Sequence, residues 1–138
     1  MKLETLTASQ AAKLLENKEV SSVELTQACL ERIELRNGEV GAFAHIDPEF
    51  SLKQAALADS EPRRSSFQGV PFGVKDVIDT KDFLTERGTP IHAGRQPVAD
   101  AKCVQLMREA GAVLLGKLVS TEYAMFTPNE TRHPLDLT

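Results

Sequence analysis

A single lysine, Lys75, stands at the end of the apolar run G-V-P-F-G-V-K-D of residues 69–76. Valine and phenylalanine are typical of strands, so the run predicts a strand with Lys75 where it ends. One interpretation is structural, with the amine extended into solvent beyond apolar methylenes. The other is chemical, because a buried ammonium must be paired, lose its proton or take part in a reaction. A lysine whose pKa is lowered towards neutrality is a base that can activate a serine hydroxyl.

The residues after Lys75 favour the chemical interpretation. The loop that follows is rich in threonine and glycine, with Thr80, Thr85, Gly88 and Thr89. It is followed by D-A-K-C-V-Q-L-M-R-E-A-G-A-V-L-L-G-K over residues 100–117, and then by Glu122 and Tyr123. In their order, these segments resemble the first half of the amidase signature family. The resemblance covers essentially the whole chain, because residues 6–9 and the helix predicted after them also resemble the family's amino-terminal helices.

The resemblance implies an amidase-type hydrolase of carbon–nitrogen bonds in amides, with a Ser-Ser-Lys triad whose catalytic lysine is Lys75. In the family, the lysine takes a proton through a bridging serine, the second serine attacks the amide carbonyl, and backbone N–H groups hold the oxyanion. Both serines follow the lysine, the first in a G-G-S-S-G-G-type segment, and neither serine motif occurs in these 138 residues. The resemblance therefore predicts an amino-terminal portion of a longer protein, which alone hydrolyses no amide.

The resemblance also indicates a substrate pocket and partners. Met125, Phe126 and Thr127 match the neighbourhood that lines the acyl-group side of the family's pocket, although packing in a core is the preferred interpretation of Met125 and Phe126 taken singly. The expected partners are a small-molecule amide substrate and the remainder of the same protein, and a homodimer is left open. No cofactor is expected.

Two charged residues receive structural interpretations. Asp76 follows Lys75 directly and is expected to point to the other face of the strand and to hydrogen-bond a neighbouring loop, because successive strand side chains alternate. The alternative is an acid that orients Lys75. Lys117, which family members commonly share, is expected to face solvent at the end of its own strand.

Capping patterns predict the elements of the first half. T-A-S-Q at residues 7–10 and S-S-V-E at residues 21–24 fit the capping box. They predict helices over about residues 8–17 and 22–36, and the second helix should stop at Asn37 and Gly38. A short strand over residues 41–46 and a helix from Pro48 to about residue 59 follow.

The second half predicts a strand, a helix and a second strand. A long loop over about residues 79–96 leads to a helix over about residues 100–110 and a buried strand over residues 113–118. Such a crossover is nearly always right-handed and makes the two strands parallel. The predicted fold class is α/β, with amino-terminal helices plus a βαβ unit of the mixed, helix-covered sheet of the amidase signature fold, incomplete in this chain.

These elements give one expected domain arrangement. Residues 1–138 would be the amino-terminal part of a single amidase signature domain. About residues 1–60 would form its helical amino-terminal region, and residues 69–138 the first part of its signature core. In open α/β sheets, ligands bind at the carboxyl ends of the strands, which is where Lys75 is predicted.

The composition excludes several classes of protein. Hydrophobic residues at 41%, charged residues at 26% and a net charge of −4 describe a soluble globular chain with no reason to bind nucleic acid or an anionic membrane. No apolar run approaches the ~20 residues that span a bilayer. The first residues lack the apolar core of a signal peptide, so a cytoplasmic location is predicted. The two cysteines, Cys29 and Cys103, lie in predicted helices and are expected to be buried; no metal site is expected.

Three functions are compatible with the sequence. The first is an amidase-signature hydrolase, and the second is the related amidotransferase A subunit, which hydrolyses glutamine to supply ammonia within a larger assembly. The third is a non-catalytic truncated fragment that folds or binds. The hydrolase is preferred over the amidotransferase because Val77 follows Asp76, where the amidotransferase branch usually carries asparagine.

Overall fold

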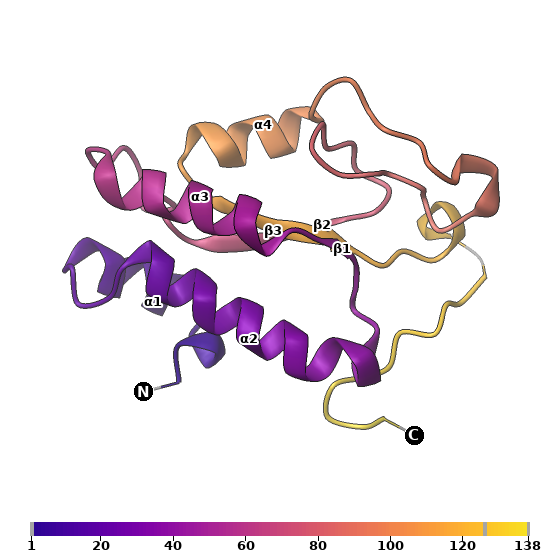
Figure 1. The fold of residues 1–138 in the computed structure, drawn as a ribbon, viewed down its shortest axis with the longest axis horizontal. Helices are drawn as coiled ribbons and strands as arrows, with labels where there is room; N and C mark the ends of the chain where they lie inside the picture. The colour runs from indigo at the N-terminus through magenta and orange to yellow at the C-terminus, as the bar shows by residue number, and fades with distance from the viewer. Residues whose placement is uncertain (1, 126, 138) are drawn as a thin grey trace.

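The structure, a computed structural model, describes residues 2–125 and 127–137. Figure 1 shows a small sheet in the middle of the molecule with helices around it. The strands are β1 (Phe43–Ile46), β2 (Pro71–Lys75) and β3 (Val113–Leu118). The α-helices are α1 (Ala8–Glu16), α2 (Ser22–Val40), α3 (Pro48–Ser60) and α4 (Lys102–Glu109), and short 3₁₀ turns cover Leu3–Thr5, Pro90–His92 and Glu122–Ala124. The fold class is α/β, as the sequence predicts.

The first two α-helices begin where their capping boxes predict. The side chain of Thr7 accepts from the backbone of Gln10, and the side chain of Gln10 accepts from the backbone of Thr7. Ser21 and Glu24 make the same reciprocal pair at the start of α2. Each box satisfies two backbone N–H groups that a helix start otherwise leaves without a partner.

The end of α2 corrects the prediction. The helix continues through Asn37 and Gly38 to Val40, and Gly41 caps it in the left-handed conformation with φ at 63°. Asn37 instead joins α2 to the sheet, because its side chain accepts from the Phe43 N–H at 2.8 Å and donates to the Phe43 carbonyl at 3.0 Å. Asn37, a residue type that is common at helix ends, here lies inside the helix and hydrogen-bonds the next strand.

The sheet has the strand order β1-β3-β2, so β3 is central. β2 and β3 are parallel, which confirms the predicted βαβ unit, whereas β1 pairs with β3 in the antiparallel direction. The first five residues of β3 are all buried. A strand that is buried on both faces typically has a continuous apolar sequence, and V-L-L-G at residues 113–116 is such a sequence.

The core joins the sheet to α3, α4 and the loop after β2. Its buried members are Val74, Phe83, Val104 and Leu114, with Phe50, Phe72, Ile78 and Ala101 packed against them. The rings of Phe50 on α3 and Phe83 in the loop meet edge to face with centroids 5.5 Å apart. The loop is therefore packed as part of the core.

α4 is shorter than predicted, and one of its residues corrects an expectation. Ala101 caps the helix without a side-chain hydrogen bond. Cys103 is exposed, although it was expected to be buried, because Val104 is the residue of this first turn that enters the core.

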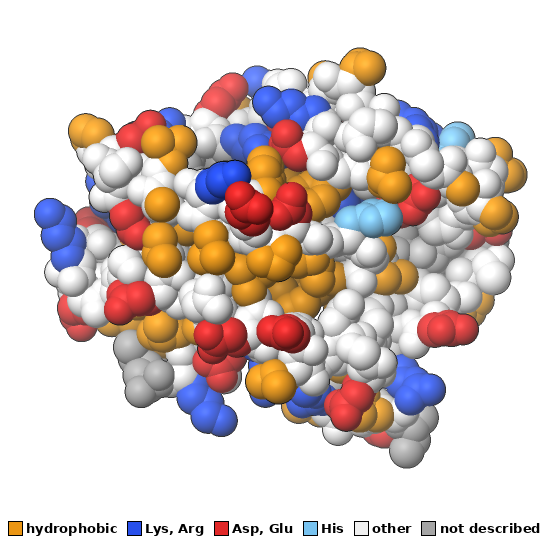
Figure 2. Space-filling view, viewed as in Figure 1, with side chains coloured by type: hydrophobic (Ala, Val, Ile, Leu, Met, Phe, Trp, Pro, Cys, Tyr) orange, Lys and Arg blue, Asp and Glu red, His pale blue; other side chains and the backbone are white. Residues whose placement is uncertain are grey.

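Several hydrophobic side chains remain outside this core. Figure 2 shows hydrophobic side chains gathered near the centre of one face of the molecule, with carboxylates around them. The large hydrophobic side chains that are exposed include Leu35, Ile91 and Leu135. Within residues 2–125 and 127–137, no helix is both long and apolar enough to cross a membrane.

Candidate active site

Two lysines lie at the carboxyl ends of the parallel strands. Lys75 is the last residue of β2 and pairs with Leu118, and Lys117 on β3 pairs with Val74. Lys75 is exposed, whereas no part of Lys117 is exposed. The expectation that Lys117 faces solvent is therefore wrong. β3 is the central strand, and the loop after β2 folds over the side chain near its end.

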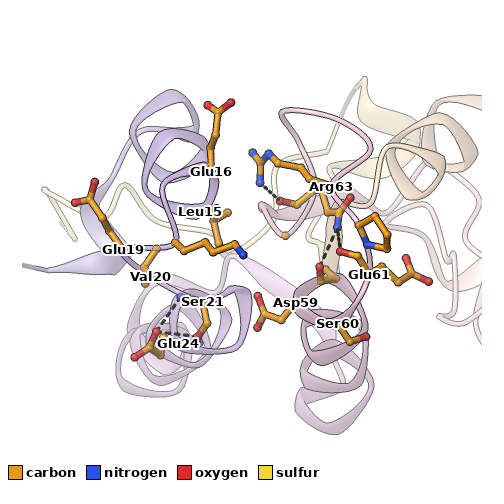
Figure 3. A pocket seen from close by; sticks show the side chains of 15 residues that line it. Leu15, Glu16, Glu19, Val20, Ser21, Glu24, Asp59, Ser60, Glu61 and Arg63 are labelled. Atoms are coloured by element: carbon orange, nitrogen blue, oxygen red, sulfur yellow. Dashed lines mark hydrogen bonds between the residues drawn. The ribbon is translucent and has the colours of Figure 1, made fainter.

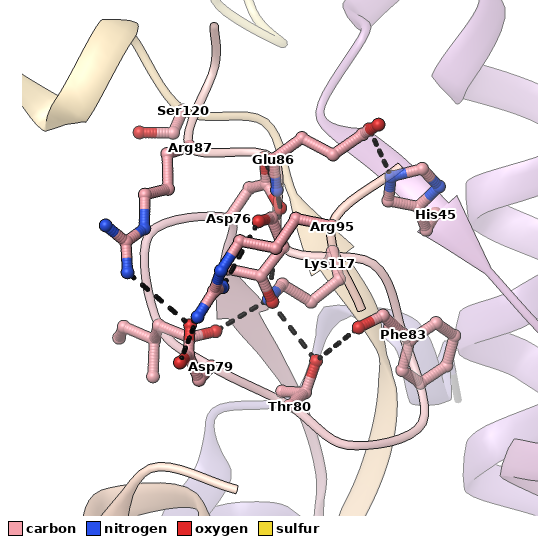
Figure 4. Close-up of polar contacts among 12 residues, drawn as sticks. His45, Asp76, Asp79, Thr80, Phe83, Glu86, Arg87, Arg95, Lys117 and Ser120 are labelled. Carbon is pink, nitrogen blue, oxygen red and sulfur yellow. Dashed lines mark hydrogen bonds and ion pairs between the residues drawn. The ribbon is translucent and has the colours of Figure 1, made fainter. Parts of the chain in front are cut away.

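The ammonium group of Lys117 is enclosed by this loop, as Figure 4 shows. Nζ donates to the Ile78 carbonyl at 2.6 Å, to Thr85 Oγ1 at 2.6 Å and to Thr80 Oγ1 at 3.3 Å. A lysine ammonium has three N–H donors, and each has an acceptor here. The buried charge is thus fully hydrogen-bonded.

Burial lowers the pKa of Lys117 from 10.5 to about 8. Loss of hydration is the largest cause, and the positive charge of Arg95 acts in the same direction. The negative charges of Asp76, Asp79 and Asp100 oppose this effect. Asp76 Oδ1 lies 3.9 Å from Nζ, so this carboxylate is an electrostatic neighbour and no direct hydrogen-bond partner of the ammonium.

Asp76 holds the loop, as expected. Its carboxylate accepts from the Glu86 N–H at 3.1 and 3.2 Å and from the Gly88 N–H at 3.3 Å. Its own backbone carbonyl accepts from the Arg87 N–H at 3.0 Å. The residue after Lys75 therefore fixes the turn of residues 86–88 and does not orient the amine of Lys75.

Gly88 is required in this turn for two reasons. Its φ is +64°, and a Cβ built on it would lie 2.4 Å from the Ser120 carbonyl oxygen. Only glycine adopts that conformation without cost and allows so close an approach. The turn is consequently wedged between Asp76 on one side and the segment after β3 on the other.

An ion pair and a carboxylate–imidazole contact brace the outside of the same loop. Arg95 binds Asp79 through two hydrogen bonds of 2.7 Å, and this pair lowers the pKa of Asp79. Glu86 accepts from the Gly94 N–H at 2.7 Å and contacts His45 Nε2 on β1 at 3.0 Å. The Gly94 hydrogen bond is the main reason that the pKa of Glu86 is lowered. Residues 76–95 are thereby tied to β1 as well as to β3.

A shallow cavity of about 300 Å³ opens over this arrangement. Its lining includes Asp76, Glu86, Gly88, Thr89 and Ser120. These residues come from the turn after β2, the loop and the segment after β3. The lining also includes the apolar residues Ala44, Pro90, Ala93 and Val119. The carboxyl end of the sheet therefore carries a concave surface with both polar and apolar groups, in the place where α/β folds bind ligands.

Met125 and Thr127, two of the predicted pocket residues, are not among the residues that line this cavity. Met125 is 71% exposed, so packing in the core does not explain it. Thr127 is also exposed and donates its hydroxyl to Glu122 at 3.3 Å. Phe126 lies outside the described residues. The role of Met125 and Thr127 in a pocket stays a prediction.

A larger cavity belongs to another part of the molecule. It has a volume of about 870 Å³ and lies between α1, the start of α2 and the end of α3 (Figure 3). Gly69, which precedes β2, lines it, so it lies at the opposite end of that strand from Lys75. Asp59 on this wall accepts from the N–H groups of Ser22 and Val23 at 2.7 and 3.1 Å. This carboxylate already has structural partners.

Comparison with known proteins agrees with the fold and with the sequence pattern. The family model described as Amidase matches residues 24–138, and the chain belongs to this family. The A subunit of the glutamyl-tRNA(Gln) amidotransferase of Chloroflexus aggregans is 41% identical over 132 residues, which cover 93% of this chain and 27% of that protein.

Two solved structures extend the comparison. The peptide amidase of Stenotrophomonas maltophilia superposes with a TM-score of 0.81 at 32% identity, over 93% of this chain and 27% of that one. A chain from a vestigial protein complex, described in connection with the origins of an s-triazine catabolic enzyme, superposes with a TM-score of 0.88 at 26% identity, over 96% of this chain and 31% of that one. The chain spans less than a third of the length of each of these three proteins.

Sequence reasoning missed the burial of Lys117. One signal was available, because Lys117 is followed by the apolar Leu118, which shows that the strand continues past the lysine. The acceptors of its ammonium come from residues 32 to 39 positions earlier, and no local pattern relates them to Lys117.

Proposed function

We propose that this chain provides the amino-terminal part of a hydrolase of amide carbon–nitrogen bonds, with Lys75 as the lysine of a Ser-Ser-Lys triad. The observation that carries the proposal is the place of Lys75, which is exposed at the carboxyl end of a parallel strand whose next residue, Asp76, is fixed by the loop. Lys75 has a firmly held backbone and an accessible amine. The serines would come from residues outside the 138 of this chain.

The chemistry requires that Lys75 be covered in the complete site. A lysine removes a proton from a serine hydroxyl only as the neutral amine, and withdrawal from water favours that form. The side chain is exposed in the described structure, so the residues that carry the serines must also cover it. In domain terms, we propose that residues 1–138 are part of one amidase signature domain that such residues complete.

A second candidate is the glutamine-hydrolysing A subunit of an amidotransferase. It is favoured by the amidotransferase relative from Chloroflexus aggregans, whose identity to this chain exceeds that of the two solved structures described above. Val77 in place of asparagine argues for the hydrolase. The two candidates share amide hydrolysis and differ in whether the released ammonia passes to another site.

The direct test begins with the coding sequence after Thr138. An in-frame glycine–serine segment supports the proposal, and an immediate stop codon supports the non-catalytic fragment. The longer chain is then assayed with simple amides and with glutamine. Turnover of simple amides supports the hydrolase, and turnover confined to glutamine supports the amidotransferase.

Lys75→Ala in that longer chain should reduce amide hydrolysis by several orders of magnitude with the fold intact. The control is Lys81→Ala, which removes another exposed lysine from the loop after β2. Near-normal turnover of Lys75→Ala would remove Lys75 from the mechanism.

The 138-residue chain alone should hydrolyse no amide, because it contains no residue matched to either serine. The measurement is a burst of product from an activated ester. A burst that a serine-directed reagent abolishes would contradict the proposal.

A further inference from the structure

A second lysine at the site has no part in the triad proposed above, although it is the most completely buried charged side chain among the described residues. Lys117 lies on the strand next to Lys75, paired with the residue before it. Burial of an ammonium is costly, and a methionine of similar length would fill the same space without a charge. The arrangement of the hydrogen-bond partners of Lys117 explains why a charged side chain is found in this buried place.

The acceptors of Lys117 all belong to the segment that follows Lys75. One of them also connects directly to Lys75, because the Ile78 carbonyl accepts from Lys117 Nζ while the Ile78 N–H donates to the Lys75 carbonyl at 2.9 Å. A short path of two hydrogen bonds therefore runs from the ammonium of Lys117 to the backbone of Lys75.

The remaining contacts close the segment around the same point. Thr80 and Thr85 are both fully buried, and both accept from Lys117 through their hydroxyls. The Asp76 N–H donates to the Leu118 carbonyl at 2.9 Å, one residue beyond Lys117. The Lys75 carbonyl is thus bound by Ile78, whose own carbonyl accepts from Lys117, and the next N–H along the chain, that of Asp76, is bound by the residue after Lys117.

We infer that Lys117 is a positioning residue, whose three hydrogen bonds hold residues 76–88 in one conformation and thereby fix the backbone and direction of Lys75. The inference rests on the proposed function only in taking Lys75 as the catalytic base. Lys117 itself lines neither of the cavities described above and is not a catalytic residue.

The charged groups around Lys117 come from two segments. Asp76 and Asp79 belong to the turn after β2, and Arg95 and Asp100 belong to the chain before α4. Asp79 pairs with Arg95 and Asp100 with Arg108, so each of these two carboxylates has a basic partner. A change in the surrounding loop near pH 8 would report on Lys117, whose pKa is lowered to about 8.

The test is amide hydrogen exchange by NMR, comparing the wild type with Lys117→Met in the longer chain of the proposal above, or in the 138-residue chain where sedimentation shows a monomer. The reporters are four loop amides with known acceptors: Ile78, Glu86, Arg87 and Gly88. Protection at these amides should fall at least tenfold in Lys117→Met, while protection in the middle of α2 changes less than twofold. Lys81→Met, which removes an exposed lysine of the same loop, should leave all of these values unchanged.

A pH titration adds a measurement that distinguishes a titrating ammonium from a side chain that only fills space. The amide shifts of Thr85 and Ile78 should show an inflection at about pH 8 in the wild type, where Lys117 titrates, and none in Lys117→Met. If Lys117→Met does not fold, Thr85→Val removes one acceptor alone and should lower protection several-fold at the same amides.

Unchanged protection at the four amides, or an equal loss in α2, would overturn the inference, as would the lack of an inflection in the wild type. The experiment needs no turnover. A failure of Lys75 as the catalytic base would therefore leave it intact, and its own failure would leave the proposed amide hydrolysis standing.

Discussion

The carboxyl ends of β2 and β3 carry the same residue type on neighbouring parallel strands and give it opposite surroundings. β2 is an edge of the described sheet, and Lys75 at its end is exposed. β3 is the centre of that sheet, and Lys117 is fully buried with three hydrogen bonds. The comparison teaches that the position of the strand in the sheet, and not the residue type or its local sequence, determines whether the lysine amine is exposed or buried.

Truncation of each lysine should give the largest difference in stability between the two strand ends. Lys117→Ala should lower the free energy of unfolding by about 3–5 kcal/mol, because it removes buried methylenes and leaves three buried acceptors without their donor. Lys75→Ala should change it by less than about 0.5 kcal/mol, as exposed substitutions usually do. Urea denaturation followed by circular dichroism measures both. Equal losses would show that the two strand ends do not differ in the way described.

The pH dependence of stability should separate the lysines as well. The folded pKa of Lys117 is about 8, below the value of about 10.4 for an unfolded lysine, so the folded state binds fewer protons between these two pH values. Unfolding then takes up a proton, and the free energy of unfolding should rise with pH across this window, by about 3 kcal/mol in total.

Lys117→Met is the reference for this measurement, because it lacks the titrating group and keeps the other basic residues. Urea denaturation at pH 7.5, 9 and 10.5 would give the difference between the two proteins. Parallel profiles would contradict the assigned environment of Lys117.

A smaller effect should come from the turn that covers Lys117. Gly88→Ala should cost about 2 kcal/mol, because it places a side chain at positive φ and against the Ser120 carbonyl. Gly38→Ala is the matched control: Gly38 lies inside α2 with no atom within 4 Å of an added Cβ. This control should stabilise the protein by about 0.5–1 kcal/mol. Thermal melts would show the opposite changes in stability of the two variants, and stabilisation by Gly88→Ala would contradict the close approach of Gly88 to the Ser120 carbonyl.

The exposed apolar side chains lead to a prediction for the isolated chain. Leu35, Ile91 and Leu135 are each at least 75% exposed, and β2 is a sheet edge whose backbone can pair with another strand. We expect the 138-residue chain to self-associate or to pack loosely. Sedimentation with a thermal melt measures this, and a monodisperse monomer with a sharp cooperative transition would contradict it.

Local patterns predicted the elements because their causes are local. The capping boxes at Thr7 and Ser21 lie within four residues of sequence, and both helices begin there. The apolar run of β3 and its crossover through α4 were likewise sufficient to predict the parallel pair. The end of α2 was missed because the partner of Asn37 is a backbone group in the next strand, and such a partner has no signature in the helix.

The site was predictable only in part, for the same reason. The strand-end position of Lys75 followed from the sequence, and so did the role of Asp76 in holding a loop. The burial of Lys117 did not, because it depends on a loop whose own period is irregular and whose path is set by Phe83 in the core. A lysine next to apolar residues is compatible with either environment until the covering segment is placed.

The bond from Asp59 to the first turn of α2 has a consequence for the order in which the chain acquires structure during synthesis. The carboxylate that occupies the Ser22 and Val23 amides lies 37 and 36 residues downstream of them. While α2 leaves the ribosome it has only its own capping box, and the external carboxylate arrives after α3 has almost been completed. At the about 5–20 residues per second of translation, this interval lasts seconds, far longer than helix formation requires. The two helices should therefore become a stable pair as one late step, with the ribosome setting its timing.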